Sequence, residues 1–223
     1  MSEKPTAPLP SLVLPVDASD VLRDCRLFFL KRLGGLVQRA GVGDQPALAA
    51  LIEAAGAFYD EMVAAAGRAG FEQADGLTAS RITLVGDDAL ELEIRLGELA
   101  AHLAEACADT LWRVYQRYIT LLQRPELAWD DNPVGPEGIA RGLTALATAL
   151  ALPLDKTLPL LDRVENLLAE ELPGLYGELN DLLAARQVQT SVPQRVIVAD
   201  VARAAPQPAG ETVPGNVLAA LQQ

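Results

Sequence analysis

The chain has 223 residues, of which 30 are Asp or Glu and 18 are Lys or Arg, giving a formal net charge of −12. Nucleic acids and anionic lipids are bound through cationic side chains, so this balance argues against a nucleic-acid partner and against a membrane. Half of the residues are hydrophobic but only 4% are aromatic, so the core must consist mainly of Leu, Ala and Val, which favours helices over strands.

Residues 1–16 contain four prolines and little that could cap or continue a helix. They are therefore predicted to be a disordered leader in front of a helical bundle domain at residues 17–190. Apolar residues recur at helical spacing from about Ser19 to Ala40, and Gly41-Val42-Gly43 ends this first helix. Five basic residues are distributed around its apolar positions: Arg23, Arg26, Lys31, Arg32 and Arg39.

Asp44 suits the N-cap of a second helix, which has Pro46 in its first turn and an apolar stripe that continues to Met62. Residues 82–85 could form a short extended segment, but no partner strand of comparable quality is present, so no sheet is expected. The next helix is expected to begin at Asp88, which has capping-box spacing with Glu91, and to continue to about Gln123. At about 34 residues and about 50 Å, it is predicted to be the spine of the fold.

A polar hinge from Arg124 to Pro136 follows, and Pro136 opens the next predicted helix. After Pro153, Asp155 is expected to cap a last long helix that reaches about Arg186 and is kinked or interrupted at Pro173-Gly174. We therefore predict an all-α fold, an antiparallel helical bundle of five or six helices with disordered proline-rich termini.

Residues 191–223 are predicted to form a flexible tail that ends in a short amphipathic segment. The apolar residues of that segment are Val213, Val217, Leu218 and Leu221. Two interpretations stay open for it. It is either a frayed end or a peptide that docks on its own core, on another subunit or on a different protein.

The predicted location follows from three features of the chain. No stretch approaches the roughly 20 apolar residues that cross a bilayer, and the N-terminus lacks the basic and apolar pattern of a secretory signal. Cys25 and Cys107 each occupy an apolar helical position, so we interpret them as buried thiols in a reducing compartment. We expect a soluble cytoplasmic protein.

Several short runs have the order and spacing of a known family. They are residues 82–91, Arg124-Pro125-Glu126-Leu127, residues 131–137 and residues 175–180. They resemble a large family of uncharacterised proteobacterial proteins, some of which carry an automatic thymidine phosphorylase label. The resemblance is good over residues 82–188, poor before them and faint at 213–221. It implies a bacterial cytoplasmic protein in a helical family without assigned chemistry, and this chain is a compact relative or a fragment of longer members.

These motifs contain the candidate ligand-binding or structural site. Asn132-Pro133 and Gly135-Pro136 suit a change of chain direction between two helices. Tyr176 and Asn180 are one helical turn apart and could pack or hydrogen-bond inside the bundle. A structural role is the preferred interpretation, and the alternative is a shared ligand site. The candidate residues are Asp130, Asp131, Asn132, Tyr176 and Asn180.

The sequence shows no recognisable catalytic or cofactor motif. His102 is the single histidine and cannot supply the paired Glu-x-x-His ligands of a di-metal bundle. There is no nucleophile elbow and no glycine-rich phosphate loop. Phosphorolysis requires an anion site and residues that read a pyrimidine, and neither is recognisable. We expect no catalytic residue, no metal and no cofactor.

The leading functional hypothesis is a non-enzymatic protein-interaction or regulatory module that binds another protein or itself as a homo-oligomer. It rests on long amphipathic helices and on the missing catalytic groups. The first alternative is a small-ligand-binding protein or enzyme with a pocket between helices near Tyr176, Asn180 and the Asp130 loop. The second is attachment to a membrane surface through the basic first helix.

Overall fold

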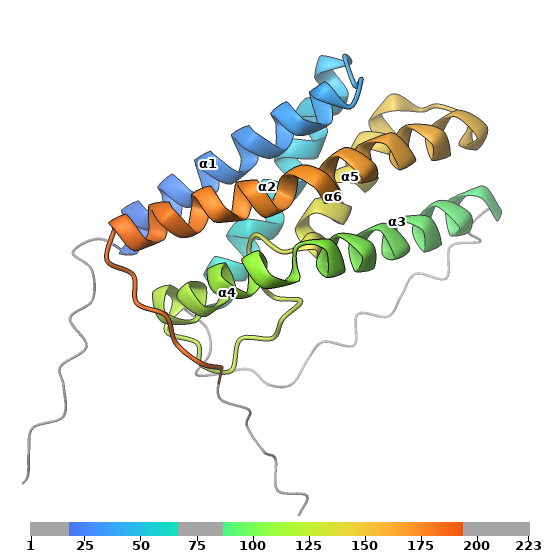
Figure 1. The fold of residues 1–223 in the computed structure, drawn as a ribbon. Helices are drawn as coiled ribbons and strands as arrows, with labels where there is room; N and C mark the ends of the chain where they lie inside the picture. The colour runs from blue at the N-terminus through green and yellow to red at the C-terminus, as the bar shows by residue number, and fades with distance from the viewer. Residues whose placement is uncertain (1–17, 67–86, 194–223) are drawn as a thin grey trace, which may run out of the picture.

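The computed structural model describes residues 18–66 and 87–193, and within these ranges the protein is entirely helical, with no strand (Figure 1). This confirms the predicted all-α fold. The predicted leader, the extended segment at 82–85 and the apolar tail residues near Val217 lie outside the described residues. The six helices are α1 (Ala18–Arg39), α2 (Gln45–Ala66), α3 (Asp87–Ala106), α4 (Ala108–Leu122), α5 (Pro136–Leu150) and α6 (Leu154–Ala185).

Local chemistry explains most of the helix ends. The Asp44 carboxylate accepts a hydrogen bond from the Ala47 amide at 2.8 Å, which confirms the predicted N-cap of α2. Pro136 occupies the first turn of α5, as predicted. α6 begins one residue before Asp155, directly after Pro153, so this carboxylate lies in the first turn and is not the cap. Gly41 ends α1 with a φ of +101°, a conformation that glycine adopts without strain.

The predicted single helix from Asp88 to Gln123 is wrong, because it is divided at Cys107 into α3 and α4. Cys107 has φ −112° and ψ 13°, outside the helical region. Its Sγ lies 2.7 Å from the Leu103 carbonyl oxygen, four residues back, where its own backbone amide also donates at 3.1 Å. A side chain that competes for this carbonyl bends helices. No proline or glycine marks the break, so helical periodicity did not reveal it.

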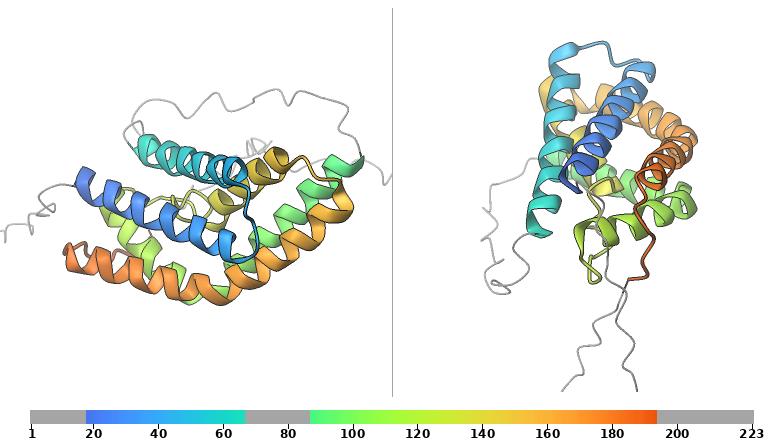
Figure 2. Two further views of the ribbon diagram at one scale, coloured as in Figure 1. Left: turned by 90° about the horizontal axis from the view of Figure 1, so that it is seen from above. Right: turned by 90° about the vertical axis from the view of Figure 1, so that its left-hand side faces the viewer.

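The longest helix is α6, with 32 residues, which continues through Pro159 and Pro173. We expected a kink or an interruption at Pro173, yet the helix is continuous and curves along the bundle (Figure 2). Each proline removes one backbone hydrogen bond. α1, α3 and α4 all pack against α6, and this packing outweighs the local loss. α6, not the predicted 88–123 helix, is the spine of the fold.

Side-chain contacts define the relative directions of the helices. Asp24 near the start of α1 pairs with Arg186 just beyond the end of α6, whereas Arg39 at the end of α1 pairs with Glu171 at 3.0 Å. α1 and α6 are therefore antiparallel, as the predicted bundle requires. α2 is antiparallel to α5 in the same sense, and these two helices share the most extensive interface in the fold.

α3 and α4 instead run in the same direction as α6. Arg95 on α3 meets Asp162, and Arg117 on α4 meets Asn180 further along α6. In Figure 1, α3 and α4 run from right to left, and so does α6. A parallel pair is possible because α3 and α6 are not consecutive in the chain.

One apolar cluster to which all six helices contribute forms the core. Its largest fully buried members include Phe29, Leu51, Leu99, Ile119 and Leu143. Leucines at helical spacing provide most of its members, with valines next, as the composition predicted, whereas alanine contributes only Ala47 and Ala55 among the described residues. Among the described helices, none has the length and apolar character needed to cross a membrane.

Candidate functional site

Two of the predicted site residues meet in the connection between α4 and α5. Asn132 is fully buried, and its Oδ1 accepts a hydrogen bond from the Val134 amide at 3.3 Å. Tyr176 is also fully buried, and its hydroxyl donates to the Val134 carbonyl at 2.7 Å. Asn132 braces this turn from within the connection, and Tyr176 holds it onto α6. The choice between a structural role and a ligand site for these residues stays a prediction.

The other predicted residues are separate from that pair. Asn180 accepts a hydrogen bond from Arg117 Nε at 2.9 Å. Asp131 lies 3.8 Å from the Arg124 guanidinium, and Asp130 is exposed to solvent. Asn132 and Tyr176 thus share Val134 as a partner, whereas the described contacts of the other three residues do not bring their polar groups to that point.

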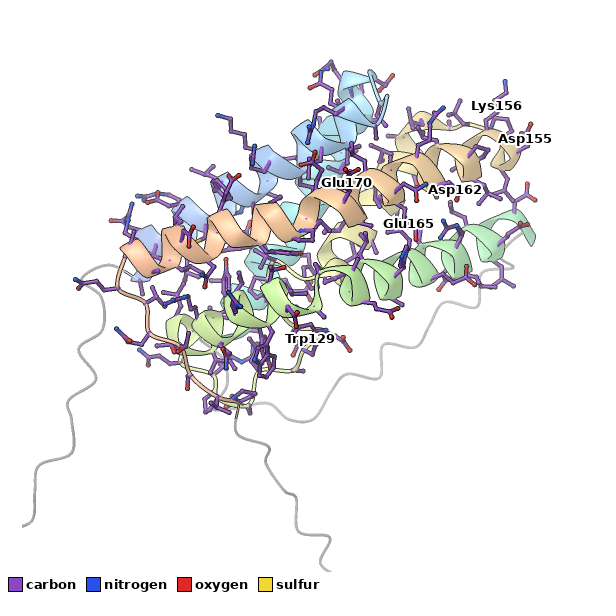
Figure 3. The ribbon with its side chains drawn as sticks, in the orientation of Figure 1. Trp129, Asp155, Lys156, Asp162, Glu165 and Glu170 are labelled. Carbon is purple, nitrogen blue, oxygen red and sulfur yellow. The ribbon has the colours of Figure 1, made fainter. Side chains whose placement is uncertain are left out.

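A cluster of aromatic rings lies beside this connection, on the outer side of α4 (Figure 3). We call Trp112, Tyr115 and Trp129 the aromatic patch. The two indoles have centroids 6.1 Å apart with planes inclined by 30°, and Tyr115 lies edge-on to Trp129 at 5.1 Å. Trp112 contacts Tyr115 at 5.5 Å. Each ring contacts the other two, so the cluster is a preformed surface.

The aromatic patch is anchored in the core by the buried Tyr115, and Trp112 is its exposed ring. The Tyr115 hydroxyl donates to the Leu127 carbonyl, which fixes the loop that carries Trp129. Trp112 remains 40% exposed, and Trp129 is partly buried. Burial raises the pKa of Tyr115, and the nearby Asp131 carboxylate raises it further. The surroundings of the patch are therefore apolar with an acidic edge.

A polar cluster that was not predicted from the sequence joins α3 to α6. Glu165 is almost completely buried. Its carboxylate forms an ion pair with Arg95 on one side and a 2.5 Å hydrogen bond with His102 Nδ1 on the other. Arg95 also pairs with Asp162 at 2.8 Å. Burial opposes ionisation of Glu165, but the hydrogen bonds from His102 and Arg95 outweigh it and leave its pKa below the usual value.

Sequence spacing contained a signal for this cluster. Arg95 and His102 are seven residues apart on one helix, and Asp162 and Glu165 are three apart on another, so each pair shares a helix face. What the spacing did not contain was the register between α3 and α6. Without it, His102 looked isolated.

The nucleophilic side chains are buried and protonated. Burial is the main cause that raises the pKa of the Cys25 thiol to about 12 and that of Cys107 to about 11. Tyr59 and Tyr118, whose hydroxyl oxygens are 3.1 Å apart, also have raised pKa values because of burial. The prediction of buried thiols is confirmed. Within residues 18–66 and 87–193, no group of three His, Cys, Asp or Glu is placed to hold a metal ion.

Comparison with known proteins adds one relationship. No curated protein matches the chain, and no solved structure matches it. Residues 48–187 match the family described as "Protein of unknown function (DUF1631) N-terminal domain". The match begins well before residue 82, where the sequence resemblance was first clear, and so includes α2. Because the match spans more than half of the chain, the protein belongs to the DUF1631 family through its N-terminal domain.

Proposed function

We propose that this domain is a non-enzymatic protein-interaction module and that the aromatic patch is its docking surface. The observation that carries the proposal is the placement of the tryptophans. The chain has two, and both lie in this one patch, with Trp112 40% exposed. Trp129 packs against the leucine-rich core, and Trp112 keeps part of its indole at the surface beside it.

Tryptophan and tyrosine are enriched among the residues that contribute most to binding energy at protein interfaces. They bury a large apolar area with little loss of conformational freedom, and their ring faces attract cations. The rings of the aromatic patch already contact one another, so a partner would not have to order them. This preorganisation favours a binding role.

The charges around the aromatic patch define the partner's chemistry. Asp109 is exposed one turn before Trp112 on α4, and Glu126, Asp130 and Asp131 lie in the loop that carries Trp129. An acidic edge around aromatic rings complements a segment with apolar and basic side chains. The partner we propose is such a segment of another polypeptide, in the bacterial cytoplasm that the sequence resemblance implies. A second copy of this chain is the alternative partner.

The other two functional hypotheses have less support. Four of the five basic residues of α1 pair with acidic side chains of this chain: Arg23, Arg26, Arg32 and Arg39. They are therefore less available to anionic lipid than the sequence suggested. The phosphorylase label on some relatives forms no part of the proposal, because the geometry around Tyr176 and Asn180 offers no described site for a nucleoside.

The test is site-specific photocrosslinking in the native bacterium. A benzoylphenylalanine at Asp109 stands beside the aromatic patch and leaves its three rings intact, whereas one at Lys31, exposed on α1, reports on a different face. We expect a discrete crosslinked product from position 109 and not from position 31. Trp112→Ala should remove the product, because it deletes the exposed indole.

Leu27→Ala is the matched control, since Leu27 is also exposed but lies on α1. It should leave the crosslink from position 109 unchanged. The proposal fails if position 109 yields no product, or if the product survives Trp112→Ala. Mass determination of the product separates the two partners, because a homo-oligomer gives twice the mass of the chain.

A further inference from the structure

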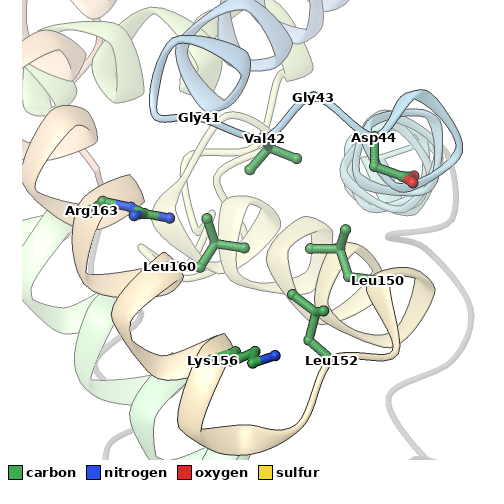
Figure 4. Close-up of a pocket in the computed structure, with 9 residues that line it drawn as sticks. All are labelled: Gly41, Val42, Gly43, Asp44, Leu150, Leu152, Lys156, Leu160 and Arg163. Carbon is green, nitrogen blue, oxygen red and sulfur yellow. The ribbon is translucent and has the colours of Figure 1, made fainter.

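An open cavity lies beside the first turns of α6 (Figure 4). It is formed where the α1–α2 turn faces the α5–α6 connection and the first turns of α6, and its volume is about 300 Å³. Tyr176 lies sixteen residues after Leu160, which lines the cavity, or about 24 Å along α6 at 1.5 Å per residue. The cavity is therefore distinct from the ligand site that the sequence suggested.

The walls of the cavity are apolar and its rim is basic. Val42, Leu150, Leu152 and Leu160 line it, together with backbone of Gly41 and Gly43. Lys156 and Arg163 are seven residues apart on α6, so they share a face of the helix, and Figure 4 shows both side chains directed toward the apolar residues.

Neither cation is engaged by an acidic side chain within the described part of the chain. Neither Lys156 nor Arg163 forms an ion pair there, although arginines on α1, α3 and α5 do. The adjacent Asp162 pairs with Arg95 instead. Asp44 is the one acidic side chain in the lining, and its carboxylate caps α2. In a chain of net charge −12, the lining of this cavity has two cationic side chains and one acidic side chain.

We propose that this cavity binds a small amphiphilic anion, with its carboxylate between Lys156 and Arg163 and its aliphatic chain against Leu150, Leu152 and Leu160. Arginine and lysine supply donors that match carboxylate oxygens. A cavity of roughly 150 Å³ accommodates a six-carbon ring. A volume of about 300 Å³ therefore suits a chain of roughly eight carbons.

The proposal is tested with octanoate as the probe, by isothermal titration calorimetry of the full chain at low ionic strength. Octanol supplies the chain without the charge, octylammonium reverses the charge, and inorganic phosphate supplies charge without the chain. We expect octanoate to bind at least about tenfold more tightly than each of the other three, because charge and apolar contact act together. Raising the salt concentration should weaken octanoate binding.

Substitutions locate the binding site. Lys156→Gln and Arg163→Gln should each weaken octanoate binding about three- to tenfold. Leu152→Glu should weaken it as well, by placing a carboxylate at the rim. All three side chains are exposed, so the fold should be retained, and circular dichroism checks this. Arg113 is exposed on α4 and has no described ion pair, so Arg113→Gln is the charge-matched control. It should bind octanoate as wild type does.

The proposal is overturned if octanol or phosphate binds as tightly as octanoate, or if the Lys156→Gln/Arg163→Gln double variant binds octanoate like wild type. Flotation with phosphatidylglycerol vesicles distinguishes a lipid headgroup from a free ligand. Recovery of wild type on these vesicles, lost in the double variant, would assign the cations to a lipid surface and overturn the free-ligand form of the proposal. No recovery, together with octanoate binding, supports it.

Discussion

Two interfaces of the bundle, α2 with α5 and α3 with α6, hold helices together by different means. On α5, Gly138 and Gly142 face α2 so closely that an added Cβ would lie 2.6 Å from Phe58 Cδ1 and 3.0 Å from the Leu51 carbonyl oxygen, respectively. Between α3 and α6, the nearly buried Glu165 instead receives Arg95 and His102. Apart from the exposed Arg141–Glu61 ion pair, the first interface depends on the absence of side chains at two glycines, whereas the second has a nearly buried charge at its centre.

The difference determines which substitutions and which solution conditions should weaken each interface. Close packing of backbones excludes water and tolerates changes of pH and salt, but it has no space for an additional methyl group. A carboxylate between two basic side chains tolerates small changes of shape, but it depends on protonation and ionic strength. Substitutions at the two interfaces should therefore fail in different ways.

The largest effect is expected from Gly138→Ala/Gly142→Ala. Both added methyl groups meet atoms closer than side chains ordinarily approach, and one of those atoms belongs to the backbone. The helices must separate, which should lower the free energy of unfolding by about 2–4 kcal/mol. Urea unfolding monitored by circular dichroism measures the change, which should be the same at pH 7 and pH 4 and in high salt. A loss below about 0.5 kcal/mol would mean that α2 and α5 are less closely packed than described here.

A smaller effect is expected from Glu165→Gln, which keeps the shape of the side chain and removes its charge. Hydrogen bonds to charged groups contribute more than neutral ones, so the free energy of unfolding should fall by about 1–3 kcal/mol. Asp162→Asn is the control within the same cluster. Its side chain is 55% exposed, so we expect Asp162→Asn to lower the free energy of unfolding by less than about 1 kcal/mol. Equal losses in the two variants would show that the burial of Glu165 is not what makes it important.

The same cluster predicts the acid dependence of stability. The pKa of Glu165 is lower in the folded protein than its ordinary value of 4.5. Its contribution is therefore fully present above about pH 4.5 and is lost as the pH falls through the lower folded value. The difference in unfolding free energy between wild type and Glu165→Gln should shrink as the pH falls below 4.5. A difference that persists unchanged at pH 3 would contradict the ionised pairing.

How far the sequence predicted these interfaces can be traced to particular residues. Helical spacing of Leu and Ala, the Asp44 cap and Pro136 predicted the all-α fold and most helix starts, because these signals are local. The break at Cys107 was missed, since neither a proline nor a glycine marks it in the sequence. The continuity of α6 through Pro173 was missed because packing by three other helices decides it.

The candidate sites depend on tertiary register, which a single sequence does not contain. Asn132 and Tyr176 were both selected from motifs, but their common partner Val134 is defined only by the fold. Trp112 and Trp129 are seventeen residues apart, and nothing local indicates that their rings meet. Lys156 and Arg163 share a helix face that periodicity could have shown. The facing α1–α2 turn, which closes the cavity, was not predictable from spacing.

The smallest expected effect is a gain in stability from Gly97→Ala, opposite in sign to the loss expected from Gly138→Ala/Gly142→Ala. Gly97 lies on the exposed side of α3, and an added Cβ there would meet no atom within 4 Å. Alanine restricts the unfolded chain and favours helix, so Gly97→Ala should raise the free energy of unfolding by about 0.5–1 kcal/mol. The chemical change at each site is the same as at Gly138 and Gly142, so opposite signs in the urea titrations of Gly97→Ala and of the double variant isolate contact with α2 as the cause. If Gly97→Ala also destabilised the protein, helix propensity could not be separated from packing, and the contrast between the two interfaces would fail.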